Sequence, residues 1–263
     1  MNNYNSITVI IPTYKSSDSL DLCIRSAIAG QQNKNQIIVA VDGTMQLNRS
    51  TLNKYKDDIQ VLDFANNVGI MTVMNHSAYA AKSDLLLFVN DDNVFPRNWD
   101  TILLEDMNKL DNTVLTPNQI EPTNSMFKQF NIINLGRDPV TFDMDKFNEY
   151  ATAISEDKID NSGSTFPFII NKLHYIMLGG FDSDFPTKSG YVADWDFFMR
   201  CSMAGLTMAR TYKLHMYHFV SLTSKSNELL NNSNKEELLC HEYTKYKYGR
   251  YIQHDNNTNL KFI

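Results

Sequence analysis

Cysteine and positive charge are both scarce in this chain of 263 residues. Its three cysteines, Cys23, Cys201 and Cys240, are odd in number and far apart, so they form neither a zinc-binding pattern nor a disulfide framework. Such cysteine usage favours a reducing compartment. Lysine and arginine number 24 against 30 aspartates and glutamates, giving a net charge of -6. This charge argues against nucleic acid as a partner, because phosphate contacts need clustered basic groups.

Long apolar runs are also missing. No stretch approaches the ~20 apolar residues that a membrane-spanning helix needs. The first residues, Met-Asn-Asn-Tyr-Asn-Ser, lack the basic flank and the apolar core of a secretory signal. We therefore expect a soluble cytoplasmic protein. An anionic substrate would be bound through a metal ion, backbone amides or a local basic group.

The first half of the sequence alternates short apolar runs with helical patterns, and 43% hydrophobic residues are ample for a packed core. Buried strands are predicted at residues 7–12, 36–41 and 85–89, and a further strand at residues 59–64. Helices are predicted between them, at residues 18–29, 46–56 and 68–81. Asn66 or Asn67 would cap the third helix. Near-continuous apolar strands separated by helices predict an α/β fold with a mostly parallel sheet covered on both faces.

The second half is less regular. Helical segments are expected at residues 99–110, 173–178, 194–204 and 234–251. Short strands are expected at residues 114–117, 166–171, 206–212 and 214–219. Residues 121–162 are polar and weakly periodic, which is typical of a binding loop. No linker that would separate two domains is apparent.

The most informative segment is the apolar run at residues 84–89, which ends in Asn90, Asp91 and Asp92. Core packing gives no reason for two adjacent carboxylates at the end of a buried strand. Binding of a divalent cation such as Mg²⁺ or Mn²⁺ would explain them, because these cations take oxygen ligands and bridge carboxylates to substrate phosphates. The segment therefore predicts a metal-assisted site for a phosphate-bearing substrate.

Polar side chains also follow the first two strands, at Thr13, Tyr14 and Asp42. Since the carboxyl ends of parallel strands share one edge, these residues and residues 90–92 should face one crevice, where open α/β sheets bind ligands. A nucleotide would suit it. Tyr14 would stack on the base or line the pocket, and Asp42 would accept hydrogen bonds from the base or the ribose. A plain turn is the alternative explanation of Asp42.

Short motifs follow one another from residue 7 to residue 220. They are Val9-Ile-Ile-Pro-Thr-Tyr14, Val41-Asp-Gly43, Asn67-Val-Gly69, Asn75 with Ala80-Ala-Lys-Ser-Asp84, Asn90-Asp-Asp92, Gly179-Gly-Phe-Asp182, Asp194-Trp-Asp196 with Arg200, Ala204-Gly205 and His218. Each is weak alone, but their number, order and spacing resemble the family 2 glycosyltransferases. That resemblance implies a Rossmann-like GT-A fold and an inverting transfer of a hexose or N-acetylhexosamine from a UDP-sugar to an acceptor hydroxyl.

The resemblance also implies which residues hold the donor. Asp92 and His218 would bind Mn²⁺ or Mg²⁺ on the diphosphate, although a structural histidine is the alternative for His218. Asn90 stands where many members carry an acid, and Asp91 would compensate through the ribose or a metal-bound water. The residues implied to contact the nucleotide are Pro12, Thr13, Tyr14, Asp42, Asn67, Gly69, Asn75 and Asp91.

Asp194 matches the catalytic base of the family, since inversion needs one carboxylate to deprotonate the attacking hydroxyl. An N-cap is the alternative role for Asp194. Asp196 lies two residues further on and should point elsewhere, so we interpret it as a helix-surface pair with Arg200 at i+4.

Three further residues would contact the sugars. Gly179 and Gly180 would let the backbone approach the donor sugar, or would simply form a turn. Trp195 would line the acceptor pocket or pack in the core. The acceptor itself would be a carbohydrate or a lipid-linked or protein-linked group.

The expected organisation is a GT-A domain at residues 1–222, with a nucleotide-binding half (1–117) and an acceptor-binding half (118–222). A C-terminal helical extension (223–263) would pack on this domain. Its alternatives are packing on a second copy, as a homodimer, and peripheral contact with a membrane that carries the acceptor.

Two other functions remain open at this stage. A sugar-phosphate nucleotidyltransferase would need a glycine-rich basic loop after the first strand, and residues 12–17 contain no glycine. A non-catalytic binding or scaffold protein is suggested by Asn90 and by Ala193, which replaces a frequent glutamate. Retention of Asp92, Asp194 and His218 argues against it.

Overall fold

The computed structural model describes the chain except residues 1, 16, 124, 126, 221–226 and 256–257. Its centre is a ten-stranded sheet with the order β3-β2-β1-β4-β9-β6-β10-β5, with β7 beside β6 and β8 beside β10. The first-half strands, which pair in parallel, are β1 (Ile7–Thr13), β2 (Gln36–Asp42), β3 (Gln60–Phe64) and β4 (Leu85–Phe88). They confirm the parallel half predicted from the apolar runs.

The second half extends the same sheet. β6 (Thr113–Glu121) and β10 (Thr207–His218) run parallel to each other. Between β4 and β6 lies the antiparallel strand β9 (Phe168–Asn171). The short strands are β5 (Asn93–Val94), β7 (Asn131–Ile132) and β8 (Ile159–Asp160). A mostly parallel sheet of this kind confirms the predicted α/β class.

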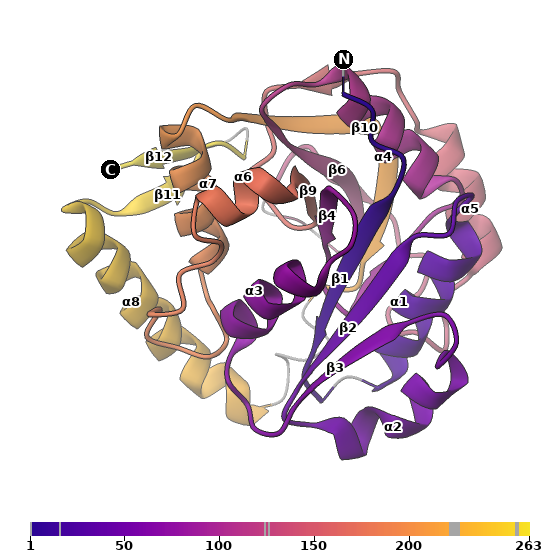
Figure 1. Ribbon diagram of the computed structural model, residues 1–263, viewed down its shortest axis with the longest axis horizontal. Helices are drawn as coiled ribbons and strands as arrows, with labels where there is room; N and C mark the ends of the chain where they lie inside the picture. Colours follow the sequence, from indigo (N-terminus) through magenta and orange to yellow (C-terminus); the bar gives the residue numbers. More distant parts are fainter. Residues whose placement is uncertain (1, 16, 124, 126, 221–226, 256–257) are drawn as a thin grey trace.

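Helices cover both faces of the sheet (Figure 1). Alternating side chains of the strands bury against these two helical layers. Val9 and Ile11 face the layer of α1 (Ser17–Gly30), α2 (Met45–Lys54) and α4 (Trp99–Lys109). Ile10 faces the layer of α3 (Ile70–Ala80), α6 (Lys172–Met177) and α7 (Ala193–Met203). None of the described helices is long and apolar enough to cross a membrane.

The predicted cap of α3 is wrong. This helix begins after Gly69, and no side chain of Asn66 or Asn67 caps it. The carboxylate of Asp42 instead accepts hydrogen bonds from the backbone N–H groups of Val68 (2.6 Å) and Gly69 (3.1 Å). A charged acceptor at the end of β2 therefore holds the segment that leads into α3, while the first N–H of the helix, that of Ile70, donates to the carbonyl of Lys188 at 3.0 Å.

The two strands predicted at residues 206–219 form one strand, β10. Its pairing with β6 shifts register between Thr211 and His215, which is where the sequence suggested a break. At this irregularity Lys213 Nζ reaches Asp106 and Asp157, each at 2.9 Å. The predicted binding loop also contains a helix, α5 (Met144–Ala153), whose N-cap Asp143 accepts from the N–H of Lys146.

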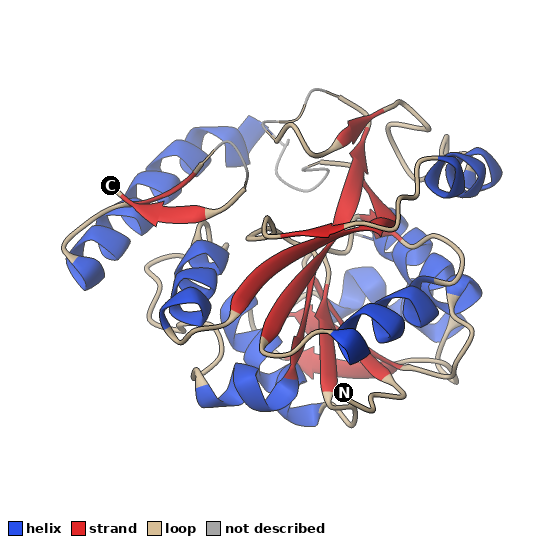
Figure 2. Ribbon diagram, turned by 90° about the horizontal axis from the view of Figure 1, so that it is seen from above, coloured by secondary structure: helices blue, strands red, loops and turns tan. Residues whose placement is uncertain are grey.

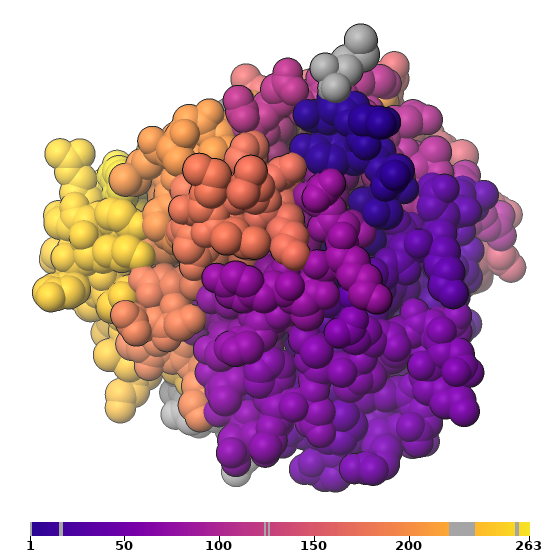
Figure 3. Space-filling view, viewed as in Figure 1, coloured from indigo at the N-terminus to yellow at the C-terminus, as the bar shows by residue number. Residues whose placement is uncertain are grey.

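The C-terminal segment consists of α8 (Asn227–Tyr248) and a hairpin of β11 (Ile252–His254) and β12 (Leu260–Phe262), so it is not purely helical. Figure 2 shows α8 and the hairpin side by side at one side of the molecule. In Figure 3 the yellow C-terminal residues lie directly against the orange part of the surface. The tail is therefore packed on the rest of the chain.

Asp196 joins this tail to α7. The interpretation of Asp196 and Arg200 as a surface pair is wrong, because Asp196 is 0% exposed. Arg200 Nε does lie 2.8 Å from its carboxylate, as the i+4 spacing predicts. Lys247 Nζ (2.8 Å) and the donating hydroxyl of Tyr248 (2.6 Å), both from α8, complete its surroundings.

We predict that Asp196→Asn lowers the free energy of unfolding by about 3 kcal/mol, because it leaves the partly buried cations of Arg200 and Lys247 without the counter-charge of this buried acid. Urea denaturation followed by circular dichroism measures this loss. Asp145→Asn is the matched control, since the Arg97–Asp145 pair is 69% and 86% exposed and should contribute almost nothing. Equal effects of the two substitutions would contradict a stabilising role for the Asp196 cluster.

Candidate active site

The loop after β4 is built around Asn93. Its side-chain Oδ1 accepts from the N–H of Asn90 at 2.8 Å, and its own N–H bonds the carbonyl of Asn90 at 3.2 Å. Asn93 then pairs with His218 as part of β5 against β10. The N–H of Phe219 also donates to the carbonyl of Asp92 at 3.3 Å. The acidic loop of β4 is therefore attached to the end of β10, although two strands separate β4 from β10 in the sheet.

Asp92 and His218 meet because of this attachment. Nε2 of His218 lies 3.4 Å from Oδ1 of Asp92, and Asp92 is only 5% exposed. On the other side of the ring, Nδ1 lies 3.3 Å from Oε1 of Glu121. Burial alone would lower the pKa of His218, but the two carboxylates outweigh it and raise this pKa to about 10. In the absence of a bound cation, the ring therefore carries the positive charge between the two acids.

Asp91 and Thr13 connect the ends of β4 and β1. The hydroxyl of Thr13 donates to Oδ2 of Asp91 at 2.7 Å, and both side chains are buried. Beneath the loop, the Cys23 thiol donates to the carbonyl of Asn90. Burial and then the charges of Asp91 and Asp92 raise the pKa of Cys23 well above its usual range. The loop thus presents a negative field, which suits a cation.

Asp194 lies at the start of α7, after a constrained turn. Val192, the residue before this helix, has a φ of 51°, which is unfavourable for a β-branched side chain. Asp194 forms no ion pair with another described side chain. Burial raises its pKa to about 6, against the opposing effect of the backbone N–H groups of Trp195 and Asp194 itself. A carboxylate with this pKa accepts a proton near neutral pH more readily than an ordinary aspartate does.

The residues expected to contact the nucleotide at the other strand ends differ in exposure and in their contacts. Tyr14 is 38% exposed, with Lys15 Nζ 4.9 Å from its ring centroid. Pro12 is buried within β1. Oδ1 of Asn67 is buried without a hydrogen-bond partner. Gly69 has a φ of 95° and lies against Lys188. Tyr14 is thus the most accessible of these groups.

Asn75 and Gly180 pack against each other, and the polar atoms of Asn75 are hydrogen-bonded within the protein. Oδ1 of Asn75 accepts from the Tyr175 hydroxyl (2.6 Å) and the Phe181 N–H (2.9 Å), while Nδ2 donates to the Phe181 carbonyl (2.8 Å). A Cβ at Gly180 would lie 2.4 Å from Asn75 Oδ1. These contacts tie α3 to the turn after α6, so the structure gives both residues a positioning role. Gly179, in contrast, has open space around it.

Trp195 points into the C-terminal segment. Its ring forms edge contacts with His241 of α8 (5.6 Å between centroids) and with His254 of β11 (4.6 Å). Nε2 of His254 is bonded to the carbonyl of Ser164 at 2.7 Å. The side of α7 next to Asp194 is therefore covered by residues that the sequence placed in a separate extension.

The side chains of Asp92 and His218 fit a divalent cation that is coordinated jointly by the protein and the substrate. A carboxylate oxygen and an imidazole nitrogen converge there, and both suit Mn²⁺. Among the described residues, no group of three or more His, Cys, Asp or Glu side chains forms a complete metal cage. A nucleotide-bound Mg²⁺ or Mn²⁺ usually has only one or two protein ligands. Phosphate oxygens and waters take its remaining positions.

Sequence reasoning missed Asn93 and Glu121. Asn93 directly follows the acidic motif, but its role depends on pairing with His218, on a strand more than 120 residues later. Glu121 ends β6, but Asn118 and Gln119 interrupt the apolar pattern before it, so the sequence lacks there the signal that identified Asp91 and Asp92. It was overlooked because the predicted strand ended at residue 117.

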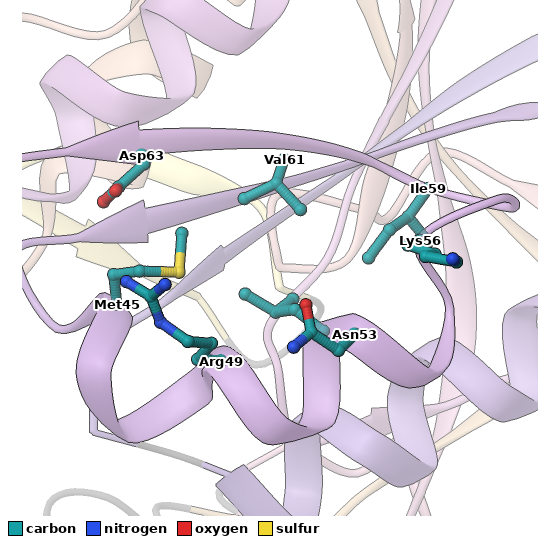
Figure 4. A pocket seen from close by; sticks show the side chains of 8 residues that line it. Met45, Arg49, Asn53, Lys56, Ile59, Val61 and Asp63 are labelled. Atoms are coloured by element: carbon teal, nitrogen blue, oxygen red, sulfur yellow. The ribbon is translucent and has the colours of Figure 1, made fainter.

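Two cavities lie away from these residues. Figure 4 shows one of about 430 Å³ between α2 and β3, lined by Arg49, Lys56, Asp63 and their neighbours. Another, of about 530 Å³, lies within residues 134–146. Neither includes a predicted site residue, so the candidate site is identified by its converging side chains rather than by a hollow.

Comparisons with known proteins point to glycosyltransferases. A family model described as Glycosyl transferase family 2 matches residues 8–166. A curated protein of Escherichia coli (strain K12), "Uncharacterized glycosyltransferase YibD", is 29% identical over 107 residues, which cover 39% of this chain and 31% of that protein. The chain thus matches about a third of this relative's length.

A solved structure is also similar. It is described as the crystal structure of GalNAc-T7 with UDP, GalNAc and Mn²⁺, and it matches with a TM-score of 0.61 at 13% sequence identity. The match covers 83% of this chain and 44% of that chain. At this identity the likeness shows the fold alone, and that fold is GT-A.

The Asn75–Gly180 contact leads to a stability prediction. Gly180→Ala should lower the free energy of unfolding by about 2–3 kcal/mol, because it adds a clash with Asn75 to the cost of a left-handed residue. Gly179→Ala is the control: its φ of 79° is equally left-handed, but nothing lies within 4 Å. It should cost only about 1–2 kcal/mol. If urea denaturation gives the same loss for both, Asn75 does not constrain this turn.

Proposed function

The chain belongs to glycosyl transferase family 2, and from this premise we propose that it transfers a hexose or N-acetylhexosamine from a UDP-sugar to an acceptor hydroxyl with inversion. The observation that carries the proposal is the convergence of Asp92 and His218 at the attached ends of β4 and β10. Asp194, with its raised pKa, supplies a separate carboxylate for proton transfer. The UDP and Mn²⁺ named for the GalNAc-T7 structure support the donor and metal class.

The metal ligands in this proposal are Oδ1 of Asp92 and Nε2 of His218. When bound, Mn²⁺ or Mg²⁺ would stabilise the negative charge that develops on the departing UDP. The roles of the protein are to hold these two ligands in place and to keep Asp91 oriented through Thr13. Asp91, so oriented, is the acid we assign to the ribose or to a metal-bound water.

The base of the nucleotide would lie at the ends of β1 and β2. Tyr14 offers an exposed ring for stacking. Asp42 already accepts two backbone N–H groups, but each carboxylate oxygen can accept more than one hydrogen bond, so it can still receive a base N–H. The loop with Asn67 and Gly69 completes this wall of the proposed uridine site.

Asp194 is the proposed general base. It would take the proton of the acceptor hydroxyl as that oxygen attacks the anomeric carbon from the side opposite the diphosphate. Burial supplies the required basicity, and the turn at Val192 fixes where α7 begins. Trp195 would form part of the acceptor side only together with the C-terminal residues that cover it. The acceptor would be a carbohydrate or a lipid-linked or protein-linked group.

The first test is a panel of UDP-, GDP- and TDP-sugars with Mn²⁺, scored by released nucleoside diphosphate and by thermal shift. We expect slow hydrolysis of one UDP-sugar, abolished by EDTA and by Asp92→Ala, because this substitution removes a metal ligand. Asp184→Asn, at an exposed position, is the control and should behave as wild type. No hydrolysis and no thermal shift with UDP and Mn²⁺ would favour the non-catalytic scaffold.

The raised pKa of Asp194 predicts a pH dependence. Turnover should fall as pH decreases through about 6, because the base becomes protonated, and Asp194→Asn should abolish turnover while donor binding is kept. Turnover by Asp194→Asn at the wild-type rate would remove this residue from the role of base.

The same pKa predicts an effect on stability. The folded-state pKa lies above the ordinary 3.8, so the stability gained from the neutral carboxyl is fully present below pH 3.8 and is lost as pH rises through about 6. Asp194→Asn should therefore raise Tm at pH 8 but not at pH 4. Scanning calorimetry at both pH values measures the difference. A pH-independent change in Tm would show that Asp194 is not destabilised as an anion.

A further inference from the structure

Glu121 is a second buried acid beside the His218 ring. It is 6% exposed, and its Oε1 lies 3.3 Å from Nδ1 of His218, while Nε2 on the opposite side of the ring faces Asp92. The ring is therefore held between two carboxylates that occupy different nitrogens. Only Nε2 points toward the acidic loop of β4.

The sheet fixes the position of Glu121. β6 runs parallel to β10 with Ile120 opposite Tyr217, so that Glu121 ends its strand beside His218. On its other side Glu121 pairs with Ile132 of β7, and its carbonyl accepts from the N–H of Ile133 at 3.0 Å. The backbone of Glu121 is thus held from both sides, which fixes the point from which its buried side chain extends toward His218.

We propose that Glu121 is a positioning residue that orients His218 as a metal ligand by accepting the Nδ1–H hydrogen bond. This inference rests on the metal site of the proposed function. An imidazole that binds a metal through Nε2 must carry its proton on Nδ1, and a carboxylate acceptor there fixes both the tautomer and the ring orientation. A negatively charged acceptor also makes the coordinating nitrogen a stronger donor.

Glu121 does not act as a ligand in this arrangement. Its carboxylate contacts the nitrogen that points away from Asp92. Within the described part of the chain, no three acidic, histidine or cysteine side chains converge as a metal site. Glu121 consequently influences a cation through His218, and this distinguishes it from Asp92 in an experiment.

The experiment is a titration of the full chain with Mn²⁺ in the presence of UDP, with free Mn²⁺ measured by electron paramagnetic resonance. Glu121→Met removes the acceptor at similar size and should weaken Mn²⁺ binding about 10–100-fold. Glu121→Gln keeps a neutral oxygen acceptor and should recover part of that loss. Unchanged Mn²⁺ affinity in Glu121→Met would overturn the proposal.

A matched control separates this effect from general destabilisation. Asp106 is another buried carboxylate that contacts β10, through Thr211 at 2.7 Å and Lys213 at 2.9 Å, but away from His218. Asp106→Asn should lower Tm and leave the Mn²⁺ affinity at the wild-type value. An equal loss of Mn²⁺ binding in Asp106→Asn would attribute the Glu121 effect to weakened folding and overturn the positioning role.

A double-mutant cycle tests whether Glu121 acts through His218. In the His218→Ala background, Glu121→Met should cause no further loss of Mn²⁺ binding, because the side chain it orients is gone. The same fold-loss in both backgrounds would make Glu121 a direct ligand and would overturn the proposal. If wild type binds no Mn²⁺ even with UDP, the metal site of the proposed function fails, and the role of Glu121 fails with it.

Discussion

The pairing of β5 with the end of β10 is the constraint on which the candidate site depends. Without it, the acidic loop after β4 and His218 would lie on strands separated by β9 and β6. Asn93 forms this link: its side chain closes the turn that contains Asp91 and Asp92, and its backbone pairs with His218. Asn93, to which we assign neither a metal-ligand nor a catalytic role, thereby brings together the two proposed ligands.

The first half of the fold could be predicted because its signals are local. The apolar runs of β1, β2 and β4 form buried strands, and the parallel pairing of β1 to β4 lies within this half. The second half could not be predicted equally well. β10 is a single strand because β6 supports it across a change of register, and α5 buries only Phe147, Asn148 and Ala151. Neither fact is visible in the periodicity of the sequence.

The site residues also fall into those whose place could be predicted from the sequence and those whose role depends on distant contacts. Asp91 and Asp92 were identified as polar groups at a strand end, and His218 through the family resemblance; the structure places all three at one edge of the sheet. Asn75 and Gly180 belong to the same set of motifs, yet their hydrogen-bonding groups and free space are used within the protein. A motif shows that a residue type is required at a position. Whether the requirement comes from a ligand or from a neighbouring turn depends on contacts made across the fold.

The partners of Asp196 have a consequence for how the protein is made. Tyr248, which donates to this carboxylate, follows it by 52 residues, and Lys247 comes from the same late turn of α8. A chain that emerges from the ribosome N-terminus first can assemble β1 to β4 early. Asp196, on the helix that carries Asp194, obtains all of these neutralising partners only after residue 248 has been synthesised. The nucleotide half and the proposed base would then mature at different moments of translation.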